Sequence, residues 1–252
     1  MTNIARYRNG HLFDLYAEEG CTALEKQIGT ALSGLTTEDY SNFDLFSGRV
    51  KHLSEVANES NCRLYVDAEQ TFIQAAIESF GQQMTHKLNV GSNVTIMNGY
   101  QCYLKRMQRL IPMEVRASQD FDHNLGIKLI RGAYMMEERA MAAEQGIESP
   151  VWDTIEDTHK CYNGNVTHII SNMKEEDKLA VGSHNLDSLK LAMDLVEEHD
   201  KKRSVRFGQL YGFSDHVTGE IAARGFHVFK AVPYGPTENV MPYLVRRGQE
   251  SR

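Results

Sequence analysis

The chain has 252 residues, of which 41% are hydrophobic and 24% charged, a composition typical of one large globular domain or two small ones. Its net charge of −7 disfavours a nucleic-acid partner, because phosphates are bound by basic surfaces. The cysteines, Cys21, Cys62, Cys102 and Cys161, lie far apart without a Cys-x-x-Cys pair, which disfavours a zinc site or a disulfide framework and favours reduced thiols.

Residues 1–60 form the first predicted segment. They carry helical patterns with breaks near Gly34 and Asn42, and no convincing strand pattern. The first part of the segment contains acidic residues and lacks an apolar core, which argues against a secretory signal and fits a mitochondrial transit peptide poorly. No apolar run approaches the roughly 18 residues that a membrane span requires. We therefore expect a helical N-terminal segment without a targeting signal.

From residue 61 onward, short strand patterns alternate with longer helical patterns in a second predicted segment, 61–252. The predicted strands are Arg63–Asp67, Val94–Asn98, Gly126–Ile130, Leu179–Ser183, Ser204–Gly208 and His227–Ala231. Helical spacing of apolar residues predicts helices over Ser188–Glu198 and around Val240–Val245. This alternation predicts βαβ units and a parallel α/β sheet. About six units are visible, whereas a closed barrel of this kind needs eight, so we expect two strands to be hidden in the first segment or missing.

Polar residues follow almost every predicted strand, at the edge where parallel α/β folds bind ligands. Strand by strand they are Asp67 and Glu69; Asn98, Tyr100 and Gln101; Lys128, Arg131 and Tyr134; His184 and Asn185; Gln209 and Leu210; Ala231, Pro233 and Tyr234. Six such groups in register favour a binding site over unrelated solvated loops. His184 taken alone is more typical of a structural hydrogen bond than of a metal ligand. The chain has no Gly-x-Gly-x-x-Gly, P-loop or His-Glu-x-x-His motif.

Two adjacent arginines, Arg246 and Arg247, end the last helical pattern, just after Tyr243. A guanidinium pair is well suited to bind a carboxylate through bidentate hydrogen bonds. Basic residues at the end of a helix also interact favourably with its dipole. The pattern by itself leaves both explanations open.

Seven motifs together carry a resemblance to a known family. They are VDAEQT (66–71), YQCYLK (100–105), KLIRGAY (128–134), SHN (183–185), FGQL (207–210), VPYGP (232–236) and PYLVRR (242–247). In this order and spacing, over roughly residues 60–252, they resemble the proline dehydrogenase family in its eukaryotic form. The resemblance implies a distorted (β/α)8 barrel with FAD at the strand ends. It also implies oxidation of L-proline to Δ1-pyrroline-5-carboxylate, with electrons passed to a membrane quinone on the matrix side of the mitochondrial inner membrane.

The resemblance also implies roles for individual residues. The catalytic residues would be Asp67, Tyr134, Arg246 and Arg247. The substrate would contact Tyr134, Leu210, Ala231, Tyr243, Arg246 and Arg247, with the two arginines on its carboxylate. FAD would contact Asn98, Lys128, Arg131, Gly132, Ala133, His184, Asn185, Gln209 and Glu250. The Lys128 cation would lie near the electron-accepting end of the flavin ring.

Three departures from the family pattern bear on substrate and activity. The family carries a lysine and a carboxylate on two strands before VDAEQT, and we find neither strand here. Ala231 stands where the family often has a tyrosine that packs on the substrate ring, so trans-4-hydroxy-L-proline is the alternative substrate. The chain stops at Arg252, where family members usually continue with a further helix. An inactive or weakened fragment, a different flavin-dependent barrel reductase and a non-enzymatic binding module are the remaining hypotheses.

Overall fold

The computed structural model describes residues 37–250 and contains a six-stranded parallel sheet in the order β1-β2-β3-β4-β5-β6. The strands are β1 (Leu64–Val66), β2 (Ile96–Gln101), β3 (Gly126–Ile130), β4 (Lys178–Gly182), β5 (Val205–Leu210) and β6 (His227–Ala231). Every neighbouring pair is parallel. The predicted α/β class and the six visible βα units are therefore confirmed. The helical patterns predicted before residue 37 lie outside the described residues.

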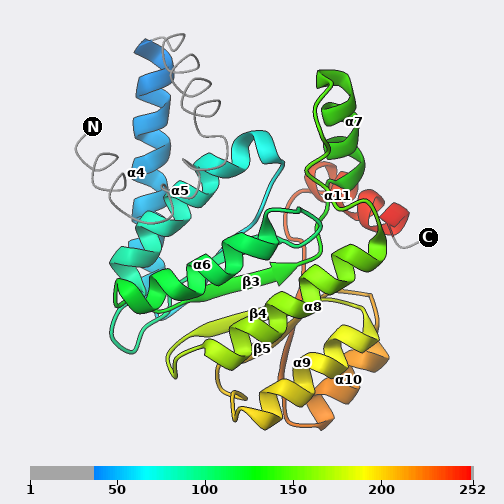
Figure 1. The fold of residues 1–252 in the computed structure, drawn as a ribbon. Helices are drawn as coiled ribbons and strands as arrows, with labels where there is room; N and C mark the ends of the chain where they lie inside the picture. The colour runs from blue at the N-terminus through cyan, green and yellow to red at the C-terminus, as the bar shows by residue number, and fades with distance from the viewer. Residues whose placement is uncertain (1–36, 251–252) are drawn as a thin grey trace.

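Helices precede, connect and follow the strands, and several of them cover the outer face of the sheet (Figure 1). They are α4 (Thr37–Glu59), α5 (Thr71–Leu88), α6 (Met107–Asp120), α7 (Met135–Gln145), α8 (Ile155–Asn172), α9 (Leu186–Glu198), α10 (Asp215–Ala223) and α11 (Thr237–Glu250). The helices predicted over Ser188–Glu198 and around Val240–Val245 correspond to α9 and α11. Helix α7 stands away from the sheet on the same side of the molecule as α11 (Figure 1).

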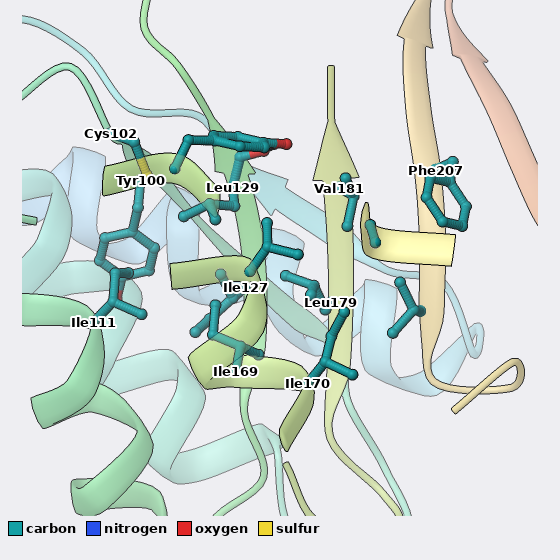
Figure 2. Close-up of a cluster of buried hydrophobic side chains, with 14 of the residues drawn as sticks. Tyr100, Cys102, Ile111, Ile127, Leu129, Ile169, Ile170, Leu179, Val181 and Phe207 are labelled. Carbon is teal, nitrogen blue, oxygen red and sulfur yellow. Dashed lines mark hydrogen bonds between the residues drawn. The ribbon is translucent and has the colours of Figure 1, made fainter. Parts of the chain in front are cut away.

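The main core lies between the outer face of the sheet and helices α6, α8 and α9. Alternate residues of a strand point to the same face, so Ile127 and Leu129 of β3 both face outward. They meet Ile169 and Ile170 of α8, with Val181 of β4 beside them (Figure 2). None of these five side chains is more than 1% exposed. Burial of this apolar surface holds the helix layer on the sheet.

The inner face of the sheet is curved, and two aromatic residues show how strongly. Tyr65 lies on β1 and Phe229 on β6, the first and last strands in the order, yet their ring centroids are only 5.8 Å apart. Both rings pack against the buried side chains of Met97 and Ala180. The six strands therefore form a half-barrel whose ends approach across its interior. Within residues 37–250, β1 and β6 each pair with only one neighbour.

Strand β2 ends three residues later than the sequence pattern predicts, and it begins two residues later for a local reason. The side-chain oxygen of Asn89 accepts hydrogen bonds from the backbone N–H groups of Thr95 (2.9 Å) and Ile96 (2.8 Å). Its amide group donates to the carbonyl oxygen of Ile96 at 2.8 Å. Asn89 is fully buried, so its amide replaces pairing that a neighbouring strand would supply.

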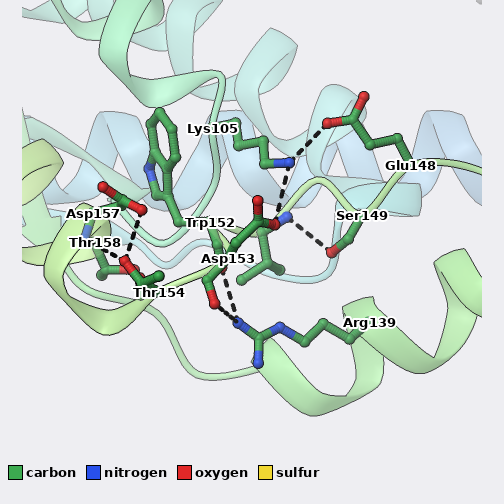
Figure 3. A network of polar contacts seen from close by, with 10 residues as sticks. Lys105, Arg139, Glu148, Ser149, Trp152, Asp153, Thr154, Asp157 and Thr158 are labelled. Carbon is green, nitrogen blue, oxygen red and sulfur yellow. Dashed lines mark hydrogen bonds and ion pairs between the residues drawn. The ribbon is translucent and has the colours of Figure 1, made fainter.

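The segment between α7 and α8 is held to the rest of the fold by polar contacts (Figure 3). The Lys105 ammonium pairs with Glu148 at 2.8 Å. The Arg139 guanidinium of α7 donates to the carbonyl oxygen of Trp152 at 2.9 Å. The hydroxyl of Thr154 caps α8 by accepting the N–H of Asp157. These contacts hold α7 and the segment after it in place. Helix α7 directly follows the KLIRGAY motif.

Helix α7 also caps the start of α5. The N-cap residue of α5 makes no side-chain hydrogen bond to the helix. Instead, the buried carboxylate of Glu138 accepts the backbone N–H and the hydroxyl of Thr71, each at 2.6 Å. Because a carboxylate is favoured at the positive end of a helix, this contact joins α7 to α5.

Changing Glu138 to Gln should lower the free energy of unfolding by about 1.5–3 kcal/mol, the range for hydrogen bonds to a charged group. The matched control is Glu137→Gln, in the same helical turn but exposed, which should change it by less than about 0.5 kcal/mol. Urea denaturation of the two variants measures the difference. Equal stability losses would contradict the capping role.

Candidate functional site

The carboxyl ends of β1, β2 and β3 are tied together by one buried side chain, Gln101. Its amide group donates to the carbonyl oxygen of Glu69 at 2.9 Å, and its side-chain oxygen accepts the N–H of Ala133 at 3.1 Å. Only 1% of Gln101 is exposed. Gln101 thus spaces the loops that follow three neighbouring strands. From the sequence we expect Gln101 at the end of a strand, but we predict no individual role for it.

Asp67 and Lys128 meet across the inner face through an intervening glycine. The register pairs Val66 with Asn98 and Gly99 with Lys128, so Asp67, Gly99 and Lys128 lie in one row. The Lys128 ammonium donates a hydrogen bond to the Asp67 carboxylate. A side chain at Gly99 would come within 3 Å of the backbone of β1. The missing side chain lets the two charged groups approach each other over the middle strand.

The loop after β3 is shaped by Gly132. Its φ of 143° is a backbone conformation that other residues rarely adopt, and a Cβ there would overlap the ring of Tyr103. The N–H of Tyr103 also donates to the carbonyl oxygen of Arg131 at 2.7 Å. This packing sets the path of the loop that leads from β3 to Tyr134.

Tyr134 lies within electrostatic reach of both arginines of α11. The carboxylate of Glu69 lies near its hydroxyl. Burial, and then this carboxylate, raise the pKa of Tyr134 to about 12, while the cations of Arg247 and Arg246 act in the opposite direction. The structure therefore brings the predicted catalytic tyrosine and the arginine pair together, and it adds Glu69, which the sequence places at a strand end without a role.

The apolar part of the predicted substrate site also gathers here. Leu210 of β5 and Ala231 of β6 are register partners. On α11, the Arg247 guanidinium lies 5.0 Å from the ring centroid of Tyr243. Ala231 is exposed, so its surface is open to a ligand.

His184 is oriented by the neighbouring strand. Its Nε2 accepts the N–H of Leu210 at 3.2 Å, which places the ring proton on Nδ1. That Nδ1 is buried without a protein partner among the described residues. Burial, followed by the nearby Lys230 cation, lowers the pKa of His184, so the ring is neutral near pH 7. The adjacent Asn185 has a structural role, since its side chain accepts the N–H of Ser188 at 3.0 Å and caps α9.

Two of the predicted cofactor residues point into the helix layer. The Asn98 amide donates to the hydroxyl of Thr85 on α5 at 3.0 Å. Gln209 accepts a hydrogen bond from Thr218 on α10. Both side chains alternate with the residues that face the interior, so the structure does not bring them to the site. Their contact with a cofactor stays a prediction, as does that of Glu250, whose side chain lies outside the described residues.

Arg131 extends from the end of β3 toward α8 and α9. Its guanidinium donates to Ser183 and Ser188, each at 2.8 Å, and to Nδ1 of His159 at 3.1 Å. All three acceptors are neutral, and Arg131 forms no ion pair with any residue in 37–250. Its charge therefore remains available to an anion at the strand ends.

The described part of the chain holds neither a metal cluster nor a membrane-spanning helix. Residues 37–250 contain no group of three or more His, Cys, Asp or Glu side chains able to hold a metal ion. No helix in the same range is both long and apolar enough to cross a membrane. The strand ends offer cations and hydrogen-bond donors beside an apolar wall, which suits a small carboxylate and an anionic cofactor.

Comparisons with known proteins agree with this chemistry. The family described as Proline dehydrogenase matches residues 7–252. Proline dehydrogenase 1, mitochondrial, of Homo sapiens is 37% identical over 230 residues, which cover 89% of this chain and 38% of that protein. Hydroxyproline dehydrogenase of Xenopus laevis is 33% identical over 229 residues, covering 88% of this chain and 49% of that protein. The chain thus spans less than half the length of these relatives.

The fold agrees with a solved structure. Proline utilization A from Bdellovibrio bacteriovorus, inactivated by N-propargylglycine, superposes with a TM-score of 0.75 at 20% identity. The match covers 81% of this chain and 21% of that one. At this identity the likeness concerns the fold, and the sequence matches carry the assignment: this chain belongs to the proline dehydrogenase family.

Proposed function

We propose that this chain forms the substrate and cofactor face of a flavin-dependent dehydrogenase that oxidises L-proline to Δ1-pyrroline-5-carboxylate. Family membership supports the reaction class. The observation that carries the assignment to this site is the grouping of Arg246 and Arg247 with Tyr134 at the strand ends. A pair of guanidinium groups beside apolar walls suits a small amino acid whose carboxylate must be held and whose ring must be kept from water.

The residues of the site would make different kinds of interaction with the substrate. The two arginines would bind the proline carboxylate and so orient the ring. Leu210 and Tyr243 would pack against the ring and exclude water from the reacting carbon. Tyr134 keeps its proton at neutral pH, since its pKa is about 12, so it serves as a hydrogen-bond donor there.

The residues present fit FAD as the cofactor. The buried Nδ1–H of His184 has no protein acceptor, and Arg131 has no carboxylate partner, within residues 37–250. These donors, with Lys128 and the backbone at Gly132 and Ala133, would hold its polar groups. When bound, FAD would accept the hydride that leaves the proline carbon next to nitrogen. Lys128, oriented by Asp67, would place a positive charge where negative charge develops.

We further propose that electrons pass to a membrane quinone and that the protein acts in the mitochondrion, at the matrix side of the inner membrane. The family resemblance supports the quinone, and the names of the human and other eukaryotic relatives support the compartment. Contact with the membrane would be peripheral.

Anaerobic titration tests the proposal as a whole. Protein reconstituted with FAD should show flavin absorbance, and L-proline should bleach it. Two results would overturn the proposed function and favour an inactive member of the family. The protein could take up no flavin, or its bound flavin could stay oxidised when proline is added.

Changing Arg246 or Arg247 to Met should weaken proline binding about 10- to 100-fold, the equivalent of one lost hydrogen bond to a charged group. Flavin content should stay near that of the unaltered protein. Proline titrations of flavin bleaching give the affinity. The matched control is Arg203→Met, in an exposed turn, which should bind proline normally. Unchanged proline saturation in both α11 variants would exclude the carboxylate-binding role.

A hydroxyproline substrate is the second candidate, and two observations favour it. Ala231 is small and exposed, which leaves room for a ring hydroxyl, and a relative at 33% identity is named Hydroxyproline dehydrogenase. The tyrosine that the family often carries at this position should fill this space. We still favour L-proline, because seven similar relatives are named Proline dehydrogenase.

Changing Ala231 to Tyr should shift the preference toward proline, lowering kcat/KM for trans-4-hydroxy-L-proline at least about tenfold relative to proline. Ala223→Tyr, at the exposed end of α10, controls for an added tyrosine elsewhere. Steady-state assays with both substrates measure the ratio. If Ala231→Tyr leaves the ratio of the two kcat/KM values unchanged, this position does not determine substrate preference. A strong preference of the unaltered protein for hydroxyproline would reverse our assignment of L-proline as the substrate.

A further inference from the structure

Arg131 is held by a set of neutral acceptors. Its guanidinium donates to Ser183, Ser188 and His159 and lies 4.4 Å from the ring centroid of Tyr162. A guanidinium has five N–H groups. Three of them are used in these contacts, so two remain for another acceptor.

The state of His159 follows from its partner. A guanidinium only donates, so Nδ1 of His159 must present a lone pair, which places the ring proton on Nε2 and leaves the imidazole neutral. Burial and the neighbouring Arg131 cation lower the pKa of His159, which agrees with a neutral ring. His159 therefore acts on Arg131 as a fixed hydrogen-bond acceptor.

The other acceptors are fixed in the same way. The hydroxyl of Ser188 donates its proton to the side-chain oxygen of Asn163 at 2.6 Å, so its lone pairs are free to receive Arg131. The hydroxyl of Ser183 accepts the N–H of Asn185 at 3.1 Å as well as the guanidinium. Helices α8 and α9 thus both contribute groups that set the direction of one cation.

We propose that His159 is a positioning residue that holds Arg131 with its charge directed toward the diphosphate of the flavin dinucleotide. The inference rests on the proposed function, in which this site takes FAD. A carboxylate in place of His159 would orient the guanidinium equally well, but it would neutralise the charge. A neutral imidazole orients the cation and leaves its charge for an anionic ligand.

The test measures FAD affinity of the apoprotein by quenching of flavin fluorescence, so it needs no turnover. Changing His159 to Leu should weaken FAD binding about tenfold, because Arg131 loses one of its three acceptors. Changing it to Asn should restore affinity to within about twofold of the unaltered protein, since the Asn side-chain oxygen can replace Nδ1 as acceptor. Ser188→Ala is the second probe and should also weaken binding, which keeps the test decisive if His159→Leu fails to fold.

A double-variant cycle shows whether His159 acts through Arg131. Arg131→Gln should weaken FAD binding more than His159→Leu does, and the combined variant should bind no more weakly than Arg131→Gln alone. Additive losses of FAD affinity in the combined variant would overturn the positioning role, and so would normal FAD binding by both His159→Leu and Ser188→Ala. In either case, FAD binding by the unaltered protein would still uphold the proposed function. Absence of FAD binding by the unaltered protein would overturn both.

Discussion

The parallel register of the first three strands is the constraint on which the candidate site depends. Because it places Asp67, Gly99 and Lys128 in one row, an ion pair can form across β2 only where that strand carries no side chain. A shift of β2 by one residue would put Asn98 or Tyr100 between the two charges and would turn Gln101 away from Glu69 and Ala133. The helix layer holds this register in place by packing Ile127 and Leu129 against α8.

Much of the fold could be predicted from the sequence because its signals are local. All six strands and the helices α9 and α11 follow from runs and spacings of apolar residues. The start of β2 could not be predicted in this way, since Asn89 delays the strand through side-chain hydrogen bonds to Thr95 and Ile96. Such a contact has no counterpart in hydrophobic periodicity.

The site was predictable only in part, for a different reason. The motifs indicate Tyr134, Arg246 and Arg247, which the structure brings together from segments more than a hundred residues apart. Position at a strand end, however, does not tell which face a side chain takes. Asn98 and Gln209 share that position with Lys128 but face the helices. The supporting roles of Gln101, Glu138 and His159 depend on partners distant in sequence, so no local pattern reveals them.

The carboxylate of Glu138 has a consequence for motion. It lies on α7, directly after the loop that carries Tyr134, and it closes the first turn of α5. Local opening of α7 would therefore remove the acceptor of the Thr71 N–H at the start of α5, which couples the stability of the two helices. Hydrogen exchange at the N–H of Thr71 then reports on the loop of Tyr134. Any displacement of that loop that moves α7 during substrate entry or product release carries the free-energy cost of uncapping a second helix.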